Sequence, residues 1–377
     1  MVIINLIPVA AGGGLQNALS FLTELSMTDV SFKFTVFVRK GSELELFCIE
    51  QNLPYRSFNC TFLFRIRYEI FGNYFFARKN DVVAIFTLFG TAPLFRGRSI
   101  AISGFARSNI IERQVDFWAF LPFWKKWIKN IKDELIRKLV STSDVIILET
   151  NRLIELARSN EVFNDTPLRL VNMAPSSLIL KRLKEIPDAK RFNSRCEEGV
   201  VNFLYLSGAH PNKNIHRLGP FLKEIIELGL KVNMTVTLPE GAYFDKIMEE
   251  FSRLSIDGVL NNIGPIKPDD VPKVLLESDV VINVAELESF SNNWVEAWAS
   301  RRLLVCKDAG YARDSCGNAA IYIDLDNVQA SAVEVYEVVI NADRYKSYID
   351  AGKLKLKELP STKEKFREYV KIIEEFI

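Results

Sequence analysis

Residues 279–305 read DVVINVAELESFSNNWVEAWASRRLLV. Their first part, up to Ala285, is apolar and rich in β-branched residues, which predicts a buried strand. After a short polar loop, Trp294 and Trp298 lie one helical turn apart, and they predict a helix that begins near Phe290. A strand, a short loop and a helix in this order form the repeating unit of a parallel sheet with crossover helices.

The same alternation of short apolar runs and longer segments of helical period continues along the chain. Predicted strands in the first half are 2–7, 32–38, 82–86, 99–103, 144–148 and 168–172. Predicted strands in the second half are 201–206, 232–237, 258–263, 279–284, 303–306 and 320–323. Two such series predict an α/β protein with two doubly wound domains.

A charged segment with two prolines and little periodicity separates the two series, and we place a linker there. Near the end of the chain, Ser361 and Glu364 fit a capping box that opens an amphipathic helix. The expected divisions are an N-terminal domain over 1–174, a linker over 175–199, a second domain over 200–355 and a C-terminal helix over 356–377.

The composition is that of an ordinary globular protein, with 377 residues of which 48% are apolar and 25% are charged. Its 48 Lys and Arg nearly balance 47 Asp and Glu, so the net charge of +1 gives no reason to expect bulk nucleic-acid binding. The charge is uneven, because residues 1–175 carry 21 basic and 16 acidic side chains whereas residues 176–377 carry 27 and 31. We therefore expect the first half to face any anionic surface.

Cysteine usage and the N-terminal sequence indicate a cytoplasmic protein. No CxxC pair and no regular spacing occurs among the five cysteines, which argues against a disulfide framework or a zinc site: Cys48, Cys60, Cys196, Cys306 and Cys316. Residues 1–23 carry no charge, but Asn5, Pro8 and the triple glycine interrupt the run. It therefore fits neither a secretory signal nor a membrane span.

Two acidic residues in the quoted stretch are candidates for a ligand site. Glu288 lies in the predicted loop, and Glu296 lies about two turns inside the predicted helix. In open α/β sheets, ligands bind beyond the carboxyl ends of the strands, where helix N-termini expose unpaired amides. The amides around Ser289–Asn292 can therefore hold a phosphate, with Glu288 beside the group attached to it. The alternative is one solvated loop acid and one acid on a helix surface.

Glu288, seven intervening residues and Glu296, within ESFSNNWVEAWA, resemble the signature of retaining nucleotide-sugar glycosyltransferases of family 4. Similar segments follow in the family's order over nearly the whole chain: GGGLQNALSFL (12–22), YLSGAHPNKN (205–214), NIGPIKPDDVPKVLLESDVVI (262–282) and GNAAIYID (317–324). The resemblance implies the GT-B fold, in which two Rossmann-like doubly wound domains face each other across a cleft. It also implies that the first domain binds an acceptor, that the second binds a nucleotide sugar and that the last helix packs back on the first domain.

The resemblance assigns roles to particular residues. Glu288 is expected to contact hydroxyls of the donor sugar, and Glu296 to bind the nucleotide ribose. The amides of Ser289 and Phe290 are expected to bind the diphosphate, whose charge Lys213 neutralises. Cleavage of a sugar–phosphate bond develops negative charge on the leaving diphosphate, so a fixed ammonium and a helix N-terminus favour the transition state. We therefore take Glu288 and Lys213 as the candidate catalytic residues.

Further donor-binding candidates come from three loops. Gly12, Gly13 and Gly14 follow the first strand without the third glycine of a dinucleotide fingerprint, and the resemblance makes them a wall that lets backbone approach the donor phosphate or the acceptor. A plain tight turn is the alternative. His210 can hydrogen-bond the donor or be an ordinary surface histidine, and Gly264 lies in a segment that the resemblance assigns to the donor site.

The chain departs from the family pattern at two positions of physical interest. Gly208 stands five residues before the lysine, where the family usually carries an arginine. Arg217, Arg313 or a protonated His210 are candidates to replace that positive charge. Arg301 stands where a glycine usually ends the helix.

Residues 117–139, FWAFLPFWKKWIKNIKDELIRKL, predict a basic and aromatic amphipathic helix. Four lysines share one side: Lys125, Lys126, Lys129 and Lys132. Large apolar residues occupy the adjoining side: Trp124, Trp127, Ile128, Ile131 and Leu135. Such a helix can lie on an anionic bilayer with tryptophan at the level of the headgroups. The alternative is that the apolar side packs against the sheet and the lysines are solvated.

Together with the resemblance, these observations predict a retaining hexosyltransferase. It moves a hexosyl unit from a nucleotide-diphosphate sugar to a hydroxyl of a glycan or lipid-linked glycan, in cell-surface polysaccharide or glycolipid biosynthesis. We expect it in the cytoplasm, with peripheral contact to the inner membrane surface through 117–139. The alternatives are a nucleotide-sugar epimerase of the same fold and a non-catalytic, membrane-associated protein that binds nucleotide sugars.

No metal and no cofactor are expected. His210 and His216 are the only histidines, and they lack companions for a metal cluster or a catalytic triad. Asp324 and Asp326 match the DxD pattern that holds a metal in other glycosyltransferases, but they follow the last predicted strand and predict a turn.

Overall fold

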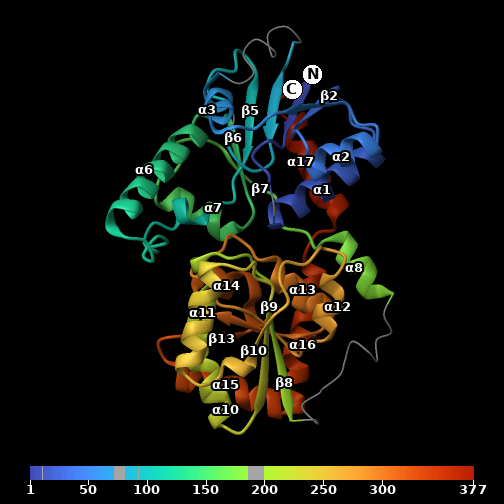
Figure 1. The fold of residues 1–377 in the computed structure, drawn as a ribbon. Coiled ribbons are helices and arrows are strands. Elements are labelled where there is room, and N and C mark those ends of the chain that lie inside the picture. Colours follow the sequence, from blue (N-terminus) through green and yellow to red (C-terminus); the bar gives the residue numbers. More distant parts are fainter. Residues whose placement is uncertain (11, 72–80, 92, 186–198) are drawn as a thin grey trace. The chain divides into compact units, whose positions relative to one another are not determined.

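The computed structural model describes residues 1–10, 12–71, 81–91, 93–185 and 199–377. These residues form two compact units (Figure 1). Unit 1 contains Met1–Ser176 and Pro360–Ile377, and unit 2 contains Ser177–Leu359. Each unit has its own parallel sheet and its own hydrophobic core.

Unit 1 is built on a seven-stranded parallel sheet with the strand order β3-β2-β1-β4-β5-β6-β7. Its strands are β1 (Val2–Asn5), β2 (Phe34–Arg39), β3 (Tyr55–Phe58), β4 (Ala84–Thr87), β5 (Ile100–Gly104), β6 (Val145–Leu148) and β7 (Leu168–Leu170). β1 is buried along its whole length, and Ile4 pairs with Val36 on one side and with Phe86 on the other. The chain builds the sheet outward from β1 in both directions, as in a doubly wound fold.

The last helix of the chain belongs to unit 1. The helices of this unit are α1 (Gly12–Met27), α2 (Glu43–Glu50), α3 (Phe62–Phe71), α5 (Ser108–Ile111), α6 (Phe123–Val140), α7 (Asn151–Ser159) and α17 (Thr362–Glu374). α17 packs on α1, where the ring centroid of Phe21 lies 5.2 Å from that of Phe366 and 5.9 Å from that of Tyr369. Ser361 and Glu364 form the capping box at its start. Residues from both ends of the sequence therefore share one core.

The sequence patterns do not predict β3. Its four residues, YRSF, include a charged and a hydroxyl side chain, and none of the four is fully buried. The strand lies at the edge of the sheet, where Tyr55 pairs with Val36. An edge strand needs little apolar sequence, so backbone pairing with β2 forms it where the hydrophobic pattern gives no signal.

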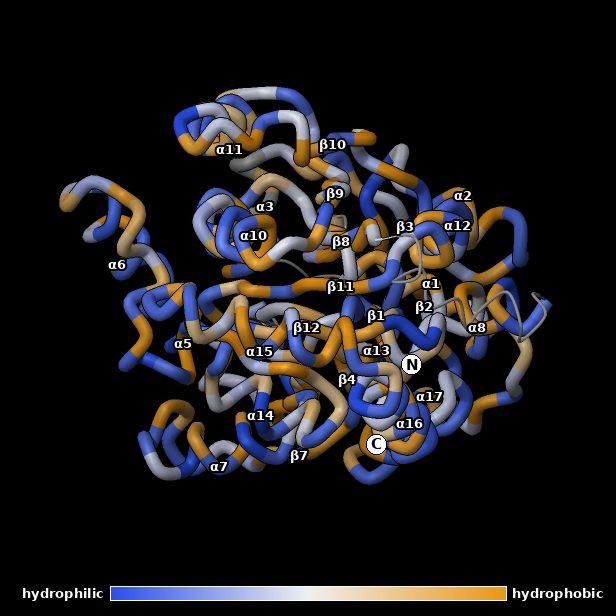
Figure 2. Tube along the Cα trace, turned by 90° about the horizontal axis from the view of Figure 1, so that it is seen from below, coloured by the Kyte–Doolittle hydropathy of each residue, from blue (hydrophilic) through white to orange (hydrophobic). Residues whose placement is uncertain are grey.

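Unit 2 is built on a six-stranded parallel sheet with the strand order β10-β9-β8-β11-β12-β13. Its strands are β8 (Val200–Tyr205), β9 (Lys231–Val236), β10 (Leu260–Asn262), β11 (Val280–Asn283), β12 (Leu303–Lys307) and β13 (Ile321–Ile323). Figure 2 shows the hydrophobic residues that run along β11, all four residues of which are buried. The prediction of an α/β protein with two doubly wound parallel sheets is confirmed.

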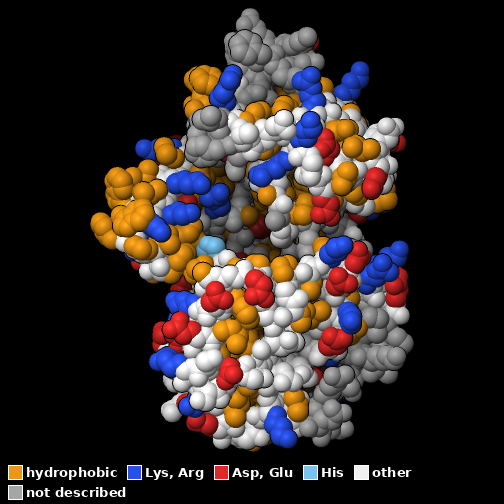
Figure 3. Space-filling model, viewed as in Figure 1, with side chains coloured by type: hydrophobic (Ala, Val, Ile, Leu, Met, Phe, Trp, Pro, Cys, Tyr) orange, Lys and Arg blue, Asp and Glu red, His pale blue; other side chains and the backbone are white. Residues whose placement is uncertain are grey.

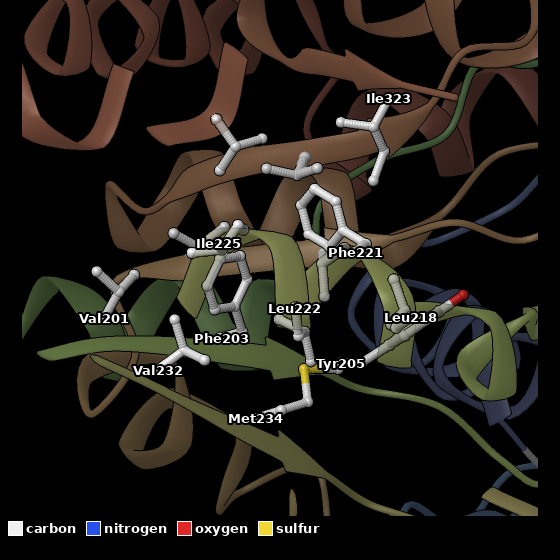
Figure 4. Close-up of a cluster of buried hydrophobic side chains, with 14 of the residues drawn as sticks. Val201, Phe203, Tyr205, Leu218, Phe221, Leu222, Ile225, Val232, Met234 and Ile323 are labelled. Atoms are coloured by element: carbon white, nitrogen blue, oxygen red, sulfur yellow. The ribbon is translucent and has the colours of Figure 1, made fainter. Parts of the chain in front are cut away.

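Helices cover this second sheet and close its core. They are α8 (Ser177–Lys184), α10 (Leu218–Glu227), α11 (Ala242–Arg253), α12 (Val271–Leu276), α13 (Asn292–Ser300), α14 (Gly310–Cys316), α15 (Val328–Ile340) and α16 (Ala342–Glu358). Phe203 on β8 lies beside Phe221 and Leu222 on α10 (Figure 4), and the two phenyl rings meet edge to face at 6.4 Å. These contacts hold β8 in the core of unit 2.

Unit 2 extends past the limits expected for the second domain. Residues 177–184, inside the expected linker, form α8, which packs against α12 and α13. At the other end, α16 runs without a break to Glu358. The linker residues 186–198 lie outside the described residues, and Cys196 is among them.

α13 ends at Arg301 in a left-handed backbone conformation, with φ 58° and ψ 46°. The amide of Arg301 donates to the carbonyls of Ala297 and Trp298, so this conformation closes the helix. A residue with a Cβ is strained there, whereas glycine is not. The structure thus gives a physical reason for the glycine of the family pattern at a position where this chain carries arginine.

We predict that Arg301→Gly stabilises the protein, because it removes the strain of a Cβ in the left-handed region. The free energy of unfolding should rise by about 0.5–1 kcal/mol, measured by urea unfolding. Arg301→Ala is the matched control, since it removes the same long side chain but keeps the Cβ. Equal stabilities of the glycine and alanine variants would show that the backbone is not strained.

Candidate functional site

The strand order of unit 2 reverses between β8 and β11. From β8 the chain first adds β9 and β10 on one side, and it then returns to add β11 on the other. Val280 on β11 pairs with Phe203 on β8, so the two strands are neighbours and point the same way. The loops that follow them, 206–214 and 284–291, leave the sheet at its carboxyl edge. Such a switch point is the usual ligand site of an open α/β sheet.

The two candidate catalytic residues meet at this switch point. Nζ of Lys213 lies 2.5 Å from Oε1 of Glu288. Lys213 comes from the loop after β8 and Glu288 from the loop after β11. Their side chains are 25% and 16% exposed, so the pair is shielded but can still be reached by a ligand.

Two asparagines beside the lysine join these loops. Nδ2 of Asn214 donates to the carbonyl of Val284 at 3.2 Å and to Oε2 of Glu286 at 3.0 Å. Nδ2 of Asn212 donates to the carbonyl of Leu287 at 3.1 Å, and its own carbonyl accepts the amide of Glu286 at 2.7 Å. Four hydrogen bonds therefore fix the loop that carries Glu288 against the loop that carries Lys213.

Asn214 adopts the backbone conformation that this arrangement needs. It ends the 3₁₀ turn η2 (Pro211–Lys213) with φ 54° and ψ 21°, a left-handed conformation that asparagine tolerates better than most residues with a side chain. The side chain of Lys213 leaves this turn toward Glu288. Asn212 and Asn214 are not among the site residues that the sequence predicts. The available signal is that asparagine favours turns, and both asparagines follow a proline here.

Glu286 and Lys307 form a second ion pair at the same edge. Nζ of Lys307, at the end of β12, lies 2.6 Å from Oε1 of Glu286. Burial raises the pKa of Glu286, but the hydrogen bonds from Lys307 and Asn214 outweigh it, so the pKa lies below its ordinary value. Glu286 therefore stays ionised and anchors the loop two residues before Glu288. The sequence offered no signal that separated it from a solvated loop acid.

Two buried tyrosines support the loops from below. The hydroxyl of Tyr205 donates to the carbonyl of Lys213 at 2.9 Å, and that of Tyr311 donates to the carbonyl of Ala285 at 2.5 Å. Burial raises the pKa of both phenols well above the ordinary value. Both tyrosines are therefore neutral hydrogen-bond donors with structural roles.

α13 begins at Asn292, two residues later than predicted, because Ser291 has an extended backbone with φ −109° and ψ 129°. The hydroxyl of Ser291 makes no capping hydrogen bond, and it accepts one from Nδ2 of Asn283 at 2.7 Å instead. Ser289 and Phe290 lie in the loop before the helix, and the Phe290 ring packs edge-on against Trp294 at 5.2 Å. A helix start without a side-chain cap favours an anion.

Glu296 lies one turn inside α13 and is 7% exposed. No hydrogen bond or ion pair to its carboxyl group is present in the described part of the chain. Burial raises its pKa to about 7. A buried carboxyl group without a partner is unfavourable in the free protein, so this position is suited to a ligand that supplies hydroxyl donors.

Of the other predicted donor-binding residues, His210 lies in the same loop as Lys213, whereas the four glycines lie elsewhere. His210 caps the turn η2, since its Nδ1 accepts the amide of Asn212 at 3.1 Å. Gly264 follows the edge strand β10, two strands from β8, with φ +73°. Gly12, Gly13 and Gly14 form the first turn of α1 in unit 1. The roles of these five residues in donor binding stay predictions.

The arginines suggested as replacements for the family's arginine are engaged in other ion pairs. Arg217 pairs with Asp326, and Nε of Arg313 lies 2.5 Å from Oδ1 of Asp308. At Gly208 itself, an added Cβ would meet nothing within 4 Å. There is therefore space for a side chain at position 208. The cation that contacts Glu288 is Lys213.

The predicted turn at Asp324 is confirmed, because its Oδ1 accepts the amide of Asp326 at 2.8 Å. Among the described residues, no group of three or more His, Cys, Asp or Glu side chains is placed to bind a metal. Among the described cysteines, Cys48, Cys60, Cys306 and Cys316 form no disulfide. No described helix combines the length and the apolar character that a membrane span requires.

Comparisons with known proteins bear on the fold. No protein-family model and no curated protein matches the sequence. A glycosyltransferase from Rickettsia africae has a similar structure, with 14% identity, coverage of 100% of this chain and 98% of that one, and a TM-score of 0.73. Anabaena Alr3699/HepE in complex with UDP-glucose shares 11% identity over 99% of both chains, with a TM-score of 0.73. WaaG, a glycosyltransferase involved in lipopolysaccharide biosynthesis, shares 10% identity over 99% of both chains, with a TM-score of 0.70. At these identities the likeness establishes the fold, and the GT-B prediction is confirmed.

We predict that Glu296 makes the stability of the protein depend on pH. Its folded pKa of about 7 lies above the ordinary value of 4.5, so the folded state binds more protons than the unfolded state between these values. Its contribution is therefore greatest below pH 4.5 and is lost as the pH rises through 7, a change of about 3 kcal/mol.

The check is urea unfolding between pH 4.5 and 8 of wild type, Glu296→Gln and Glu240→Gln. Glutamine at position 296 should remove most of the decline in stability with pH. The exposed Glu240 is the matched control, and its variant should behave as wild type. Parallel pH curves for all three proteins would mean that Glu296 is not perturbed.

Proposed function

We propose that this chain is a retaining glycosyltransferase of family 4. It transfers a hexosyl unit from a nucleotide-diphosphate sugar to a hydroxyl of a glycan or lipid-linked glycan, in cell-surface polysaccharide or glycolipid biosynthesis. The observation that carries the proposal is the contact of Lys213 with Glu288 at the switch point of unit 2, in the loop before the helix that carries the buried Glu296. Crystals of HepE with UDP-glucose make UDP-glucose the first donor to test.

In this proposal, each group of the site has a separate task. Glu296 accepts hydrogen bonds from the ribose hydroxyls, which supply the donors that its buried carboxyl group lacks. Lys213 contacts Oε1 of Glu288, so Oε2 is the oxygen that accepts from a hydroxyl of the hexose. The start of α13 and the ammonium of Lys213 stabilise the diphosphate.

The same arrangement accounts for catalysis. As the sugar–phosphate bond breaks, negative charge grows on the leaving diphosphate, and Lys213 and the helix start stabilise that charge more in the transition state than in the bound donor. Because the loops are already joined by the hydrogen bonds of Asn212 and Asn214, little reorganisation is needed. Retention follows from the family resemblance, with the acceptor attacking on the face that the diphosphate leaves.

We further propose that unit 1 binds the acceptor and that the protein works in the cytoplasm, at the inner membrane surface. Six large apolar side chains on α6 are exposed by 42–84%: Phe123, Trp124, Trp127, Ile128, Ile131 and Leu135. They do not pack against the sheet, which was the alternative. Figure 3 shows hydrophobic and basic side chains gathered together over α6. Exposed tryptophan beside lysine suits an anionic bilayer.

Donor chemistry gives the first test. Glu288→Gln should reduce hexosyl transfer by about 10²–10³-fold while leaving UDP-glucose affinity nearly unchanged, because Glu288 contacts the sugar. Lys213→Ala should also lower turnover, because it removes the charge that stabilises the leaving diphosphate. The assay incubates the protein with radiolabelled nucleotide sugars and a membrane extract, and thermal shift measures donor binding.

Glu240→Gln, on the surface of the same unit, is the control and should keep wild-type turnover. Lipid-extractable label supports transfer. An altered free sugar nucleotide would favour the epimerase, and donor binding without turnover would favour the non-catalytic protein. Wild-type rates in Glu288→Gln would remove this residue from the site.

Vesicle binding gives the second test. The double variant Trp124→Ala/Trp127→Ala should bind vesicles of phosphatidylglycerol and phosphatidylcholine at least about tenfold more weakly than wild type. Wild type should bind phosphatidylcholine vesicles less well, because the lysines lose their anionic partners. Leu46→Ala/Ile49→Ala is the matched control, since these α2 side chains are exposed by 57% and 54%. Equal losses in both double variants would contradict a specific role of α6.

A further inference from the structure

Unit 1 contains a cavity of about 330 Å³ beside α6. Two segments form it: residues 109–118, which begin within α5, and the side of α6 that carries Asn130, Asp133 and Glu134. Its volume falls at the lower end of the range of small-molecule pockets, about 300–1,000 Å³. The cavity is therefore large enough for one sugar ring, and none of the residues in the ion pairs described above lines it.

The lining has the chemistry that recognises a neutral polyhydroxylated ring. Amide side chains come from Asn109, Gln114 and Asn130, and aromatic rings from Phe117 and Trp118. An amide side chain both accepts and donates, and a carboxylate accepts with two oxygens, which suits pairs of neighbouring hydroxyls. An aromatic ring supplies an apolar surface for the carbon–hydrogen face of a sugar.

The charged side chains of the lining are already paired. Asp116, Asp133 and Glu134 contribute three carboxylates, whereas Arg113 contributes the one guanidinium of the lining. Arg113 is itself 3.1 Å from Glu134. Cations outside the lining also pair with these carboxylates: Lys126 with Asp116, Arg107 with Asp133 at 3.8 Å and Arg137 with Glu134 at 2.6 Å. Because Arg113, the cation of the lining, is already paired with Glu134, the lining fits an uncharged sugar better than a diphosphate.

Hydrogen bonds hold the lining in place without a ligand. Oδ2 of Asp133 accepts from Nε1 of Trp118 at 2.7 Å and from Nδ2 of Asn109 at 2.7 Å. One carboxylate thus orients both the aromatic ring and an amide of the cavity. Binding to a lining that is already ordered avoids the entropy loss of ordering it.

The cavity and the exposed apolar side chains lie on adjoining sides of α6, which indicates what kind of molecule can bind both. Asn130, Asp133 and Glu134 line the cavity, while Trp127 and Ile131, on the adjoining side of the same helix, are exposed by 60% and 42%. A molecule with a polar sugar head and an apolar tail matches both sides at once. We propose that this cavity binds the uncharged sugar headgroup of a glycolipid whose acyl chains stay in the bilayer. The inference rests on the proposed function, because it names the acceptor class that unit 1 would hold at the membrane.

The test compares binding to two kinds of vesicle. Both contain phosphatidylglycerol and phosphatidylcholine, and one also contains monoglucosyl diacylglycerol. The readout is the ratio of the two partition coefficients, in which any general change in membrane affinity cancels. Wild type should prefer the glycolipid vesicles by about tenfold.

Two variants alter the cavity in different ways. Asn130→Trp fills it, and Asn130→Ala removes one amide without filling it. Because Asn130 is exposed on α6, neither change disturbs the core. The ratio should fall to about one in Asn130→Trp and to an intermediate value in Asn130→Ala. Asn172→Trp, at another exposed asparagine of unit 1, is the matched control and should keep the wild-type ratio.

The outcomes separate this inference from the proposed function. A wild-type ratio of one, with UDP-glucose still raising the melting temperature, would overturn the cavity proposal and leave the donor site intact. Stronger binding to vesicles enriched in phospholipid than to vesicles that contain the glucosyl lipid would also overturn it. Loss of the UDP-glucose effect with the glycolipid preference kept would instead remove the donor proposal.

Discussion

Four hydrogen bonds from Asn212 and Asn214 join two loops that lie 70 to 75 residues apart in the sequence. The contact between Lys213 and Glu288 depends on them, because each of these residues lies on a loop with no regular structure of its own beyond one 3₁₀ turn. The bonds from Asn212 to Leu287 and from Asn214 to Val284 are buried, and a buried bond of this kind has little competition from water. The two asparagines thus affect a bound ligand indirectly, because they hold Lys213 and Glu288 in position.

The sheet of unit 2 provides the frame for those loops. Parallel strands bring their carboxyl ends to one edge, and the reversal of strand order between β8 and β11 leaves room there. Buried tyrosines fix the loops from below, and Trp298 fixes α13 from behind, since its Nε1 donates to the carbonyl of Ala319 at 3.1 Å. An added Cβ on Gly352 would lie 2.7 Å from the Trp298 ring, so α16 crosses α13 closely at this glycine. A rigid scaffold therefore carries a site made of loops.

Much of the fold could be predicted from the sequence because strands buried on both faces are recognisable as short apolar runs. β11 is the clearest case, with four buried residues in the run that was predicted. β3 could not be predicted, because an edge strand needs no such apolar run. The start of α13 was predicted two residues too early, because Ser291 has an extended backbone. Lys213 and Glu288 were proposed from family motifs, and the structure places them in contact. The asparagines and Glu286 were not chosen in this way. An asparagine after a proline predicts a turn, but it does not predict the backbone carbonyls of a distant loop as partners. The partners of Glu286, Lys307 and Asn214, also come from distant segments.

The discontinuous make-up of unit 1 has a consequence for biosynthesis. Its core contains Phe366 and Tyr369, whereas the whole of unit 2 lies earlier in the chain than these residues. A ribosome adds about 5–20 residues per second, so the first 176 residues wait on the order of ten seconds or more for the partner helix. During that interval the nascent chain exposes the surface of α1 around Phe21 that α17 later covers. Unit 2 can fold as it is translated, and unit 1 can mature only once translation reaches its final helix, so a chaperone that shields the waiting surface would act on unit 1.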